Sequence, residues 1–217
     1  MGSNPEEKSL ARMPDLPEFP GFIVFRSKPK PKSAIIGPLG RPPPIIPVTV
    51  VGESRVGKTS IIRHFRKKKF ISGYNPTFGV ARTQIEVPTP NDICDPKVIF
   101  RFLDTNDLII DRALITTPTD RMDSLMASFS RYVLIVYDVT DHTSFDAAKD
   151  WMLLVKNMIE ISTSIILIGN KCDQANKRQV HRTAGEVLAL RHDMVFLETS
   201  AKEGNNLDHL LAYITAV

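Results

Sequence analysis

Short apolar runs alternate with segments of helix length through most of the chain. The runs are residues 46–51, 98–103, 132–137, 165–168 and 194–197. Continuous apolar runs of this length are typical of strands buried on both faces, and their alternation with helical segments favours crossover connections between parallel strands. The sequence therefore predicts an α/β fold with a mostly parallel central sheet flanked by helices on both faces.

The first part of the chain is instead dominated by proline. Proline lacks a backbone donor and restricts the residue before it. We therefore expect residues 1–46 to form a disordered or extended Pro-rich arm and residues 47–217 to form the folded domain. The apolar run 22–25 is compatible with docking on the domain or with addition to a sheet edge. Residues 41–47 have the spacing of a polyproline ligand for an SH3-type partner, although a stiff lead-in to a strand is the favoured explanation.

Composition places the chain among ordinary globular proteins. Apolar residues make up 42% and charged residues 24% of it, and no uncharged apolar stretch approaches the roughly 18 residues that a membrane span needs. Two cysteines are too few for a disulfide framework, and no secretory leader opens the chain. The modest net charge of +4 gives no reason to expect a nucleic-acid partner. We expect a cytoplasmic protein that reaches membranes peripherally, through a partner.

Residues 52–59, Gly-Glu-Ser-Arg-Val-Gly-Lys-Thr, fit the Walker A pattern between a predicted strand and a helical segment. Gly52 and Gly57 let the backbone turn tightly so that its N–H groups surround a phosphate, and the helix N-terminus adds positive potential. Lys58 is expected to reach the β- and γ-phosphates, and Thr59 to hold Mg²⁺. The candidate phosphate-binding residues are Gly52, Glu53, Ser54, Arg55, Val56, Gly57, Lys58, Thr59 and Ser60.

A second motif, Asn170-Lys171-Cys172-Asp173, follows another predicted strand, and open α/β sheets bind ligands beyond the carboxyl ends of their strands. Asp173 can accept hydrogen bonds from both the ring N–H and the exocyclic amine of guanine. Adenine does not offer this pair of donors, and an unpaired buried carboxylate would cost about 1–3 kcal/mol or more. The motif therefore predicts guanine and disfavours a nucleotide kinase.

Together with residues 137–140 (Tyr-Asp-Val-Thr) and 198–202 (Glu-Thr-Ser-Ala-Lys), these motifs resemble the Rab branch of Ras-like small GTPases over roughly residues 47–217. The resemblance implies a P-loop G domain that binds GTP or GDP with Mg²⁺ and acts in signalling or vesicle trafficking. The implied base-site residues are Asn170 and Asp173 as base ligands, Lys171 packed along the base, Ala201 reading the guanine oxygen through its N–H, and Ser200 and Lys202 supporting that loop.

The same resemblance implies two switch segments. Thr77 would give its hydroxyl to Mg²⁺ and its N–H to the γ-phosphate, and with Lys58 it is a catalytic candidate; Asp104 would support Mg²⁺ through water. Asp107 and Leu108 stand where the family usually has Gly and Gln, and an aliphatic side chain cannot orient the attacking water. We therefore expect slow or partner-assisted hydrolysis of GTP to GDP. The alternative is a non-hydrolysing GTP-binding interaction module, a pseudo-GTPase.

Partners are implied only in general terms: GTP or GDP, protein effectors, an exchange factor and an activating protein. Leu103 takes the place of a tryptophan that contacts effectors in Rabs, so standard Rab effectors are not expected. The sequence ends without the prenylated cysteines of Rab tails, which predicts no stable membrane anchor.

Overall fold

The computed structural model describes residues 22–24, 43–73, 80–88, 97–105, 130–158 and 163–215. Within these ranges one sheet has seven strands, in the order β1-β7-β6-β5-β2-β4-β3. The strands are β1 (Phe22–Val24), β2 (Ile45–Val51), β3 (Val80–Pro88), β4 (Lys97–Thr105), β5 (Tyr132–Asp138), β6 (Ser164–Asn170) and β7 (Val195–Glu198). β3 pairs antiparallel with β4 and β1 antiparallel with β7, whereas the pairs between β4, β2, β5, β6 and β7 are parallel.

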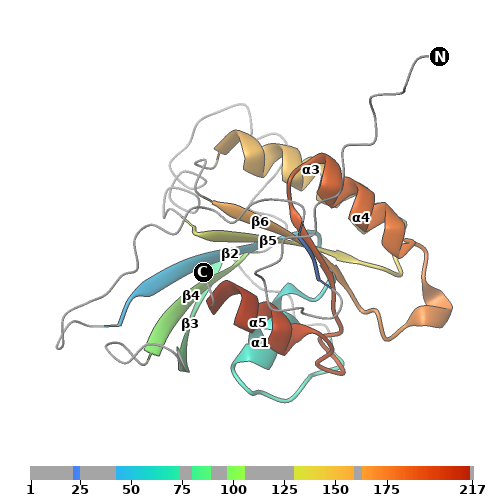
Figure 1. Cartoon of the computed structure of the whole chain (residues 1–217). Coiled ribbons are helices and arrows are strands. Elements are labelled where there is room, and N and C mark those ends of the chain that lie inside the picture. The colour runs from blue at the N-terminus through green and yellow to red at the C-terminus, as the bar shows by residue number, and fades with distance from the viewer. Residues whose placement is uncertain are drawn as a thin grey trace, which may run out of the picture.

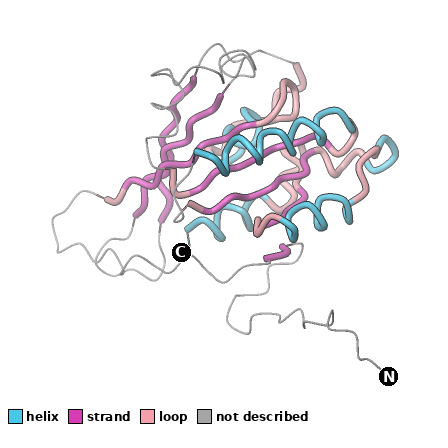
Figure 2. Tube along the Cα trace, turned by 90° about the horizontal axis from the view of Figure 1, so that it is seen from above, coloured by secondary structure: helices cyan, strands magenta, loops and turns pink. Residues whose placement is uncertain are grey.

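Helices cover both faces of this sheet. They are α1 (Lys58–Phe65), α3 (His142–Met158), α4 (Arg182–Arg191) and α5 (Leu207–Thr215), with a short 3-10 helix, η3 (Ala175–Lys177). Figure 1 shows α3 and α4 over one face of the sheet and α1 and α5 on the other. Seen from above, the helices run alongside the strands (Figure 2). The predicted α/β architecture, a mostly parallel sheet between two helical layers, is confirmed.

The core follows directly from this layering. Every residue of β5 is buried, because neighbouring strands flank it and helices cover both of its faces. Side chains that alternate along the strands form one cluster with Ile61 of α1 and Ile214 of α5, and a second with Trp151 of α3 and Ala189 of α4. A strand covered on both faces needs apolar residues at every position, and the resulting continuous apolar runs allowed these strands to be predicted from the sequence.

The arm contributes one strand. Phe22–Val24 forms β1 on the outer edge of β7, with Phe22 opposite Leu197 and Val24 opposite Val195. Residues 22–24 of the apolar run thus add to a sheet edge, one of the two roles compatible with its sequence. The boundary between arm and domain at residues 46 and 47 stays a prediction. In the structure, β2 begins at Ile45, just before that boundary.

The polyproline stretch 41–47 runs into the sheet. Its last residues belong to β2, where the Pro47 carbonyl accepts a hydrogen bond from the Arg131 N–H at 3.0 Å. Just before β2, the Pro44 carbonyl accepts from the Ile99 N–H at 3.0 Å. These contacts favour the stiff lead-in to a strand over the SH3 ligand.

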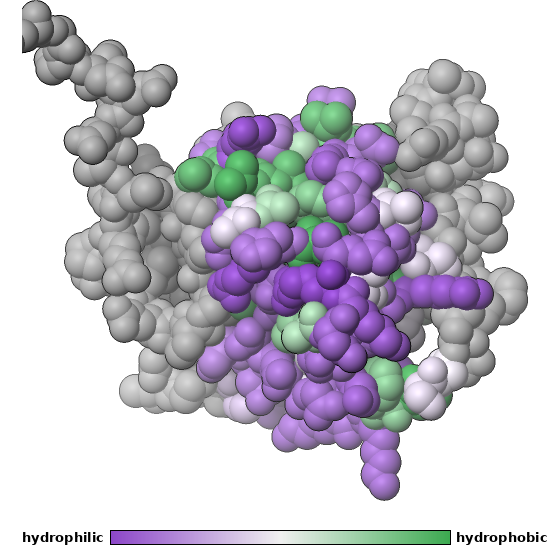
Figure 3. Space-filling view, turned by 90° about the vertical axis from the view of Figure 1, so that its right-hand side faces the viewer, coloured by the Kyte–Doolittle hydropathy of each residue, from purple (hydrophilic) through white to green (hydrophobic). Residues whose placement is uncertain are grey.

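The outer surface is mixed. Figure 3 shows a largely hydrophilic face with smaller apolar areas among the polar side chains. Large exposed apolar side chains include Leu153 on α3 and Val187 and Leu190 on α4. In the ranges that the structure describes, none of the helices combines the length and the apolar character that a membrane crossing requires.

Candidate functional site

A cavity of about 350 Å³ lies where the carboxyl ends of the central strands meet, within the usual size range of small-molecule sites. Its walls come from the loop after β2, the start of α1 and the segment after it, and the loops after β6 and β7. The predicted site residues that line it are Ser54, Arg55, Gly57, Lys58, Thr59, Ser60, Asn170, Lys171, Asp173, Ala201 and Lys202. Those not among its lining residues are Gly52, Glu53, Val56, Asp104 and Ser200.

The loop 52–57 turns through backbone conformations that favour glycine. Gly52 has φ 138° and Gly57 φ 101°. A Cβ on Gly52 would run into the Val136 backbone carbonyl, and one on Gly57 would run into the Asn170 side-chain amide. Both glycines are therefore required by conformation and by close approach, and the loop is pressed against β5 on one side and against the loop after β6 on the other.

Lys58 begins α1 and is buried, and its ammonium is hydrogen-bonded to the backbone of the preceding loop. Nζ donates to the carbonyl oxygens of Gly52 and Glu53, each at 2.7 Å. The cation is thus held across the loop while its side chain lines the cavity. An ammonium fixed at the N-terminus of a helix suits an anionic ligand such as a phosphate.

The two predicted metal-binding side chains on the described segments lie together. The Thr59 hydroxyl donates to Oδ2 of Asp104 at 2.6 Å. Asp104 is only 3% exposed, and among the described residues its Oδ1 has no hydrogen-bond partner. The pKa of Asp104 is raised, because the effect of burial exceeds the lowering by the Thr59 hydrogen bond and by the nearby Lys58 charge. Hydroxyl and carboxylate oxygens are ligands that Mg²⁺ prefers, directly or through water, so this pair fits the predicted ion.

On the other side of the cavity, Asn170 joins three segments. Its Nδ2 donates to the Val56 carbonyl at 2.8 Å, and its Oδ1 accepts from the Thr199 hydroxyl at 3.2 Å and from the Ala201 N–H at 3.1 Å. The residue is 1% exposed. Its amide therefore fastens the phosphate-side loop to the loops after β6 and β7.

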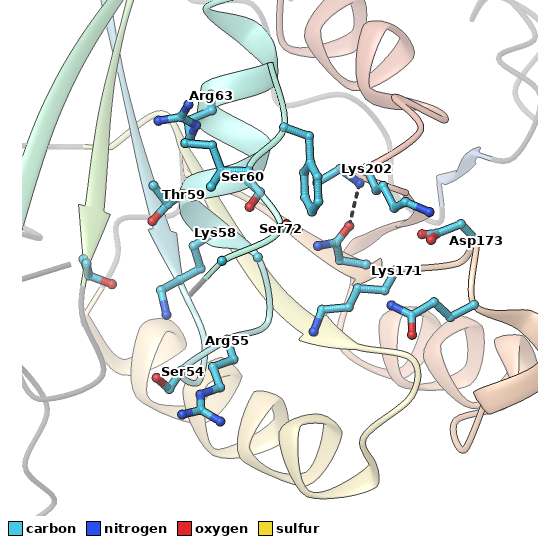
Figure 4. Close-up of a pocket in the computed structure, with 18 residues that line it drawn as sticks. Ser54, Arg55, Lys58, Thr59, Ser60, Arg63, Ser72, Lys171, Asp173 and Lys202 are labelled. Carbon is cyan, nitrogen blue, oxygen red and sulfur yellow. Dashed lines mark hydrogen bonds between the residues drawn. The ribbon is translucent and has the colours of Figure 1, made fainter. Parts of the chain in front are cut away.

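The two charged residues of the same motif are each held by a partner. The Ser200 hydroxyl donates to Oδ1 of Asp173 at 2.6 Å, and this hydrogen bond helps to fix the position of the carboxylate. Lys171 Nζ lies 2.6 Å from Oδ2 of Asp138, at the end of β5. In Figure 4, Lys58 and Thr59 lie on one side of the cavity and Lys171 and Asp173 on the other.

Some cavity residues carry no motif and were not anticipated. Phe70, 43% exposed, lines the cavity in the segment after α1, together with Ser72. Arg63 of α1 and Gln174 after the Asp173 motif do so as well. An isolated exposed aromatic residue has no signature in sequence, so only the path of the chain after α1 reveals it. The predicted Thr77, Asp107 and Leu108 lie outside the described residues.

Comparison with known proteins agrees with this site. The Ras family model matches residues 47–216. Ras-related protein Rab-13 of Rattus norvegicus is 32% identical over 162 residues, covering 73% of this chain and 72% of the relative. RabC of Dictyostelium discoideum is 33% identical over 163 residues, covering 74% and 76%. The human EF-hand calcium-binding domain-containing protein 4B is 30% identical over 176 residues, covering 80% of this chain and 22% of that protein. The chain therefore belongs to the Ras family and is a Rab-like small GTPase, a GTP-binding switch.

Proposed function

We propose that this chain hydrolyses GTP to GDP slowly, or with the help of a partner, and signals through its nucleotide state. The observation that carries the proposal is a single cavity with the Lys58 and Thr59 side chains on one side and Asp173 on the other. Cationic and hydroxyl groups suit phosphates and their metal ion, whereas a carboxylate suits the donors of guanine. These groups support a nucleotide that lies along the cavity with its phosphates in the loop 52–59.

Guanine selection would rest on Asp173 and Ala201. Asp173 would accept the guanine ring N–H and exocyclic amine while Ser200 holds its carboxylate. The Ala201 N–H, which donates to Asn170, would be shared with the guanine carbonyl oxygen. Lys171 would pack along one face of the base, and the exposed ring of Phe70 offers an aromatic surface for it. Adenine does not offer Asp173 this pair of donors, which favours guanine.

For the phosphates, we propose Lys58 and Thr77 as catalytic residues, and Thr59, Thr77 and Asp104 as the residues that hold Mg²⁺, Asp104 through water. The unpartnered buried oxygen of Asp104 supports that role, because such an oxygen otherwise costs free energy. Mg²⁺, when bound, neutralises charge on the β- and γ-phosphates. Lys58 would turn from the Gly52 carbonyl and donate to the same phosphates.

Slow turnover follows from the second switch. Water attacks the γ-phosphorus, the bond to the β-phosphate oxygen breaks, and phosphate and GDP leave. In the position that the Rab resemblance gives them, Leu108 would offer no hydrogen bond to orient that water, and Asp107 would add negative charge beside the triphosphate. An activating partner that supplies an arginine would restore about 10³–10⁵ in rate. The alternative is that the chain does not hydrolyse GTP at all and acts as a GTP-binding interaction module.

Single-turnover hydrolysis of bound GTP in the presence of Mg²⁺ tests the proposal on three forms of the full chain. Leu108→Gln is expected to hydrolyse GTP faster than the unaltered chain, because glutamine can orient the water. Lys58→Ala, the control, is expected to lose nucleotide affinity. A Leu108→Gln form that binds GTP yet hydrolyses none would reject the switch and favour the interaction module.

Regulation and location are part of the proposal. We propose that an exchange factor and an activating protein act on the chain, and that it is cytoplasmic and reaches membranes peripherally through partners. Membership of the Ras family supports this picture. Because residues 45–47 belong to β2, an SH3-type partner would be restricted to the part of the arm before them.

A further inference from the structure

Recognition of the base depends on two segments that come from different strands. The first base segment, residues 170–173, begins at the last residue of β6, and the second base segment, residues 199–202, follows β7. They contact each other through the Cys172 N–H, which donates to the Thr199 carbonyl at 3.0 Å, and through the Ser200 hydroxyl on Asp173 at 2.6 Å. A bound guanine would be hydrogen-bonded by both segments at once, so the position of one segment relative to the other must be fixed closely.

Glu198, the last residue of β7, is clamped immediately before the second base segment. Its carboxylate oxygens accept from Nη1 and Nη2 of Arg178 at 2.6 and 3.0 Å, and its backbone carbonyl accepts from the Asn206 side-chain amide at 2.7 Å. The Glu198 side chain is 7% exposed and that of Arg178 is 23% exposed. Paired hydrogen bonds of this kind fix direction as well as distance.

Arg178 comes from the chain that follows the first base segment, just after η3. Its Nη1 also donates to the Val180 carbonyl at 3.1 Å, so its own position is fixed by the backbone beside it. The hydrogen bond and the charge of Glu198 raise the pKa of Arg178. The guanidinium therefore ties the continuation of the first base segment to the start of the second.

We propose that Arg178 is a positioning residue for guanine recognition, acting through Glu198 on Ser200 and Ala201 without touching the nucleotide. The inference rests on the proposed guanine site. Without the guanidinium, Glu198 is a nearly buried carboxylate with no cation to pair with, and such a group moves toward water. That movement shifts the second base segment and loosens the support of Asp173.

The test compares GDP with IDP, which has the same phosphates and ribose but lacks the exocyclic amine that Asp173 would bind. Loss of folded protein changes both affinities together, so their ratio reports base reading. Arg178→Ala is expected to release GDP faster and to lower the preference for GDP over IDP by about threefold to tenfold, the effect of one well-placed hydrogen bond. Arg178→Lys, which keeps the charge but not the paired geometry, is expected to fall between.

Arg182→Ala is the matched control. Arg182 donates to Glu186 on the same helix at 2.8 Å, a pairing that includes no residue of either base segment, and its loss is expected to leave the GDP-to-IDP ratio unchanged. Glu198→Gln gives a second test should Arg178→Ala fail to fold, with the same expected direction. An unchanged ratio in Arg178→Ala, Arg178→Lys or Glu198→Gln, or an equal change in Arg182→Ala, overturns the inference. Failure of the unaltered chain to bind GDP would instead overturn the proposed guanine site itself.

Discussion

Replacing Asn170 with alanine measures how strongly the site depends on one side chain. The amide makes three hydrogen bonds, to the Val56 carbonyl, the Thr199 hydroxyl and the Ala201 N–H. At about 1 kcal/mol net for each, the loss of all three predicts a fall of about 3 kcal/mol in the free energy of unfolding. The Val56 carbonyl and the Ala201 N–H would be left without this partner.

Thr199→Val is the matched comparison, because valine has nearly the shape of threonine and removes only the 3.2 Å bond. It is expected to cost about 1 kcal/mol. Both variants would be unfolded in urea at one fixed GDP concentration, with GDP affinity measured separately so that the stabilisation from bound nucleotide can be subtracted. The reasoning fails if Asn170→Ala, after this correction, costs no more than Thr199→Val.

Two further substitutions test the packing around β5. Gly52→Ala is expected to destabilise the fold by more than about 2 kcal/mol, because it combines an unfavourable φ with a collision against the Val136 carbonyl; Gly73→Ala, with open space around it, is the control, and equal thermal shifts would contradict the explanation. Tyr137→Phe is expected to hold or raise stability by about 1 kcal/mol, because the buried hydroxyl has no hydrogen-bond partner among the described residues. A marked loss of stability in urea unfolding would mean that this hydroxyl makes a favourable contact.

Much of the site could be predicted because most of its ligand-binding residues lie in short continuous stretches of the sequence. The loop with Gly52, Gly57 and Lys58 and the motif with Asn170 and Asp173 are each short runs whose spacing is set by a single ligand. Apolar runs located the strands that carry them, with ends displaced by one or two residues at most positions. Sequence alone therefore reached the fold class and most of the residues that line the cavity.

The unpredicted features depend on distant contacts. Arg178 and Glu198 are twenty positions apart, and only the order of β6 and β7 in the sheet brings them together. Phe70 lines the cavity because of the path that the chain takes after α1. β3 also escaped prediction, since it is an edge strand with many exposed positions and no continuous apolar run. None of these arrangements leaves a local pattern in the sequence.

The strand β1 has a consequence for competition at the sheet edge. An outer strand offers unpaired backbone donors and acceptors with which another extended peptide can pair. The outer edge of β7 is instead paired with β1, which belongs to the same polypeptide. Because the arm is covalently joined to β2, its local concentration at β7 does not fall on dilution, whereas that of a separate peptide does. A strand-adding partner must therefore exceed a threshold concentration set by the arm before it can occupy β7.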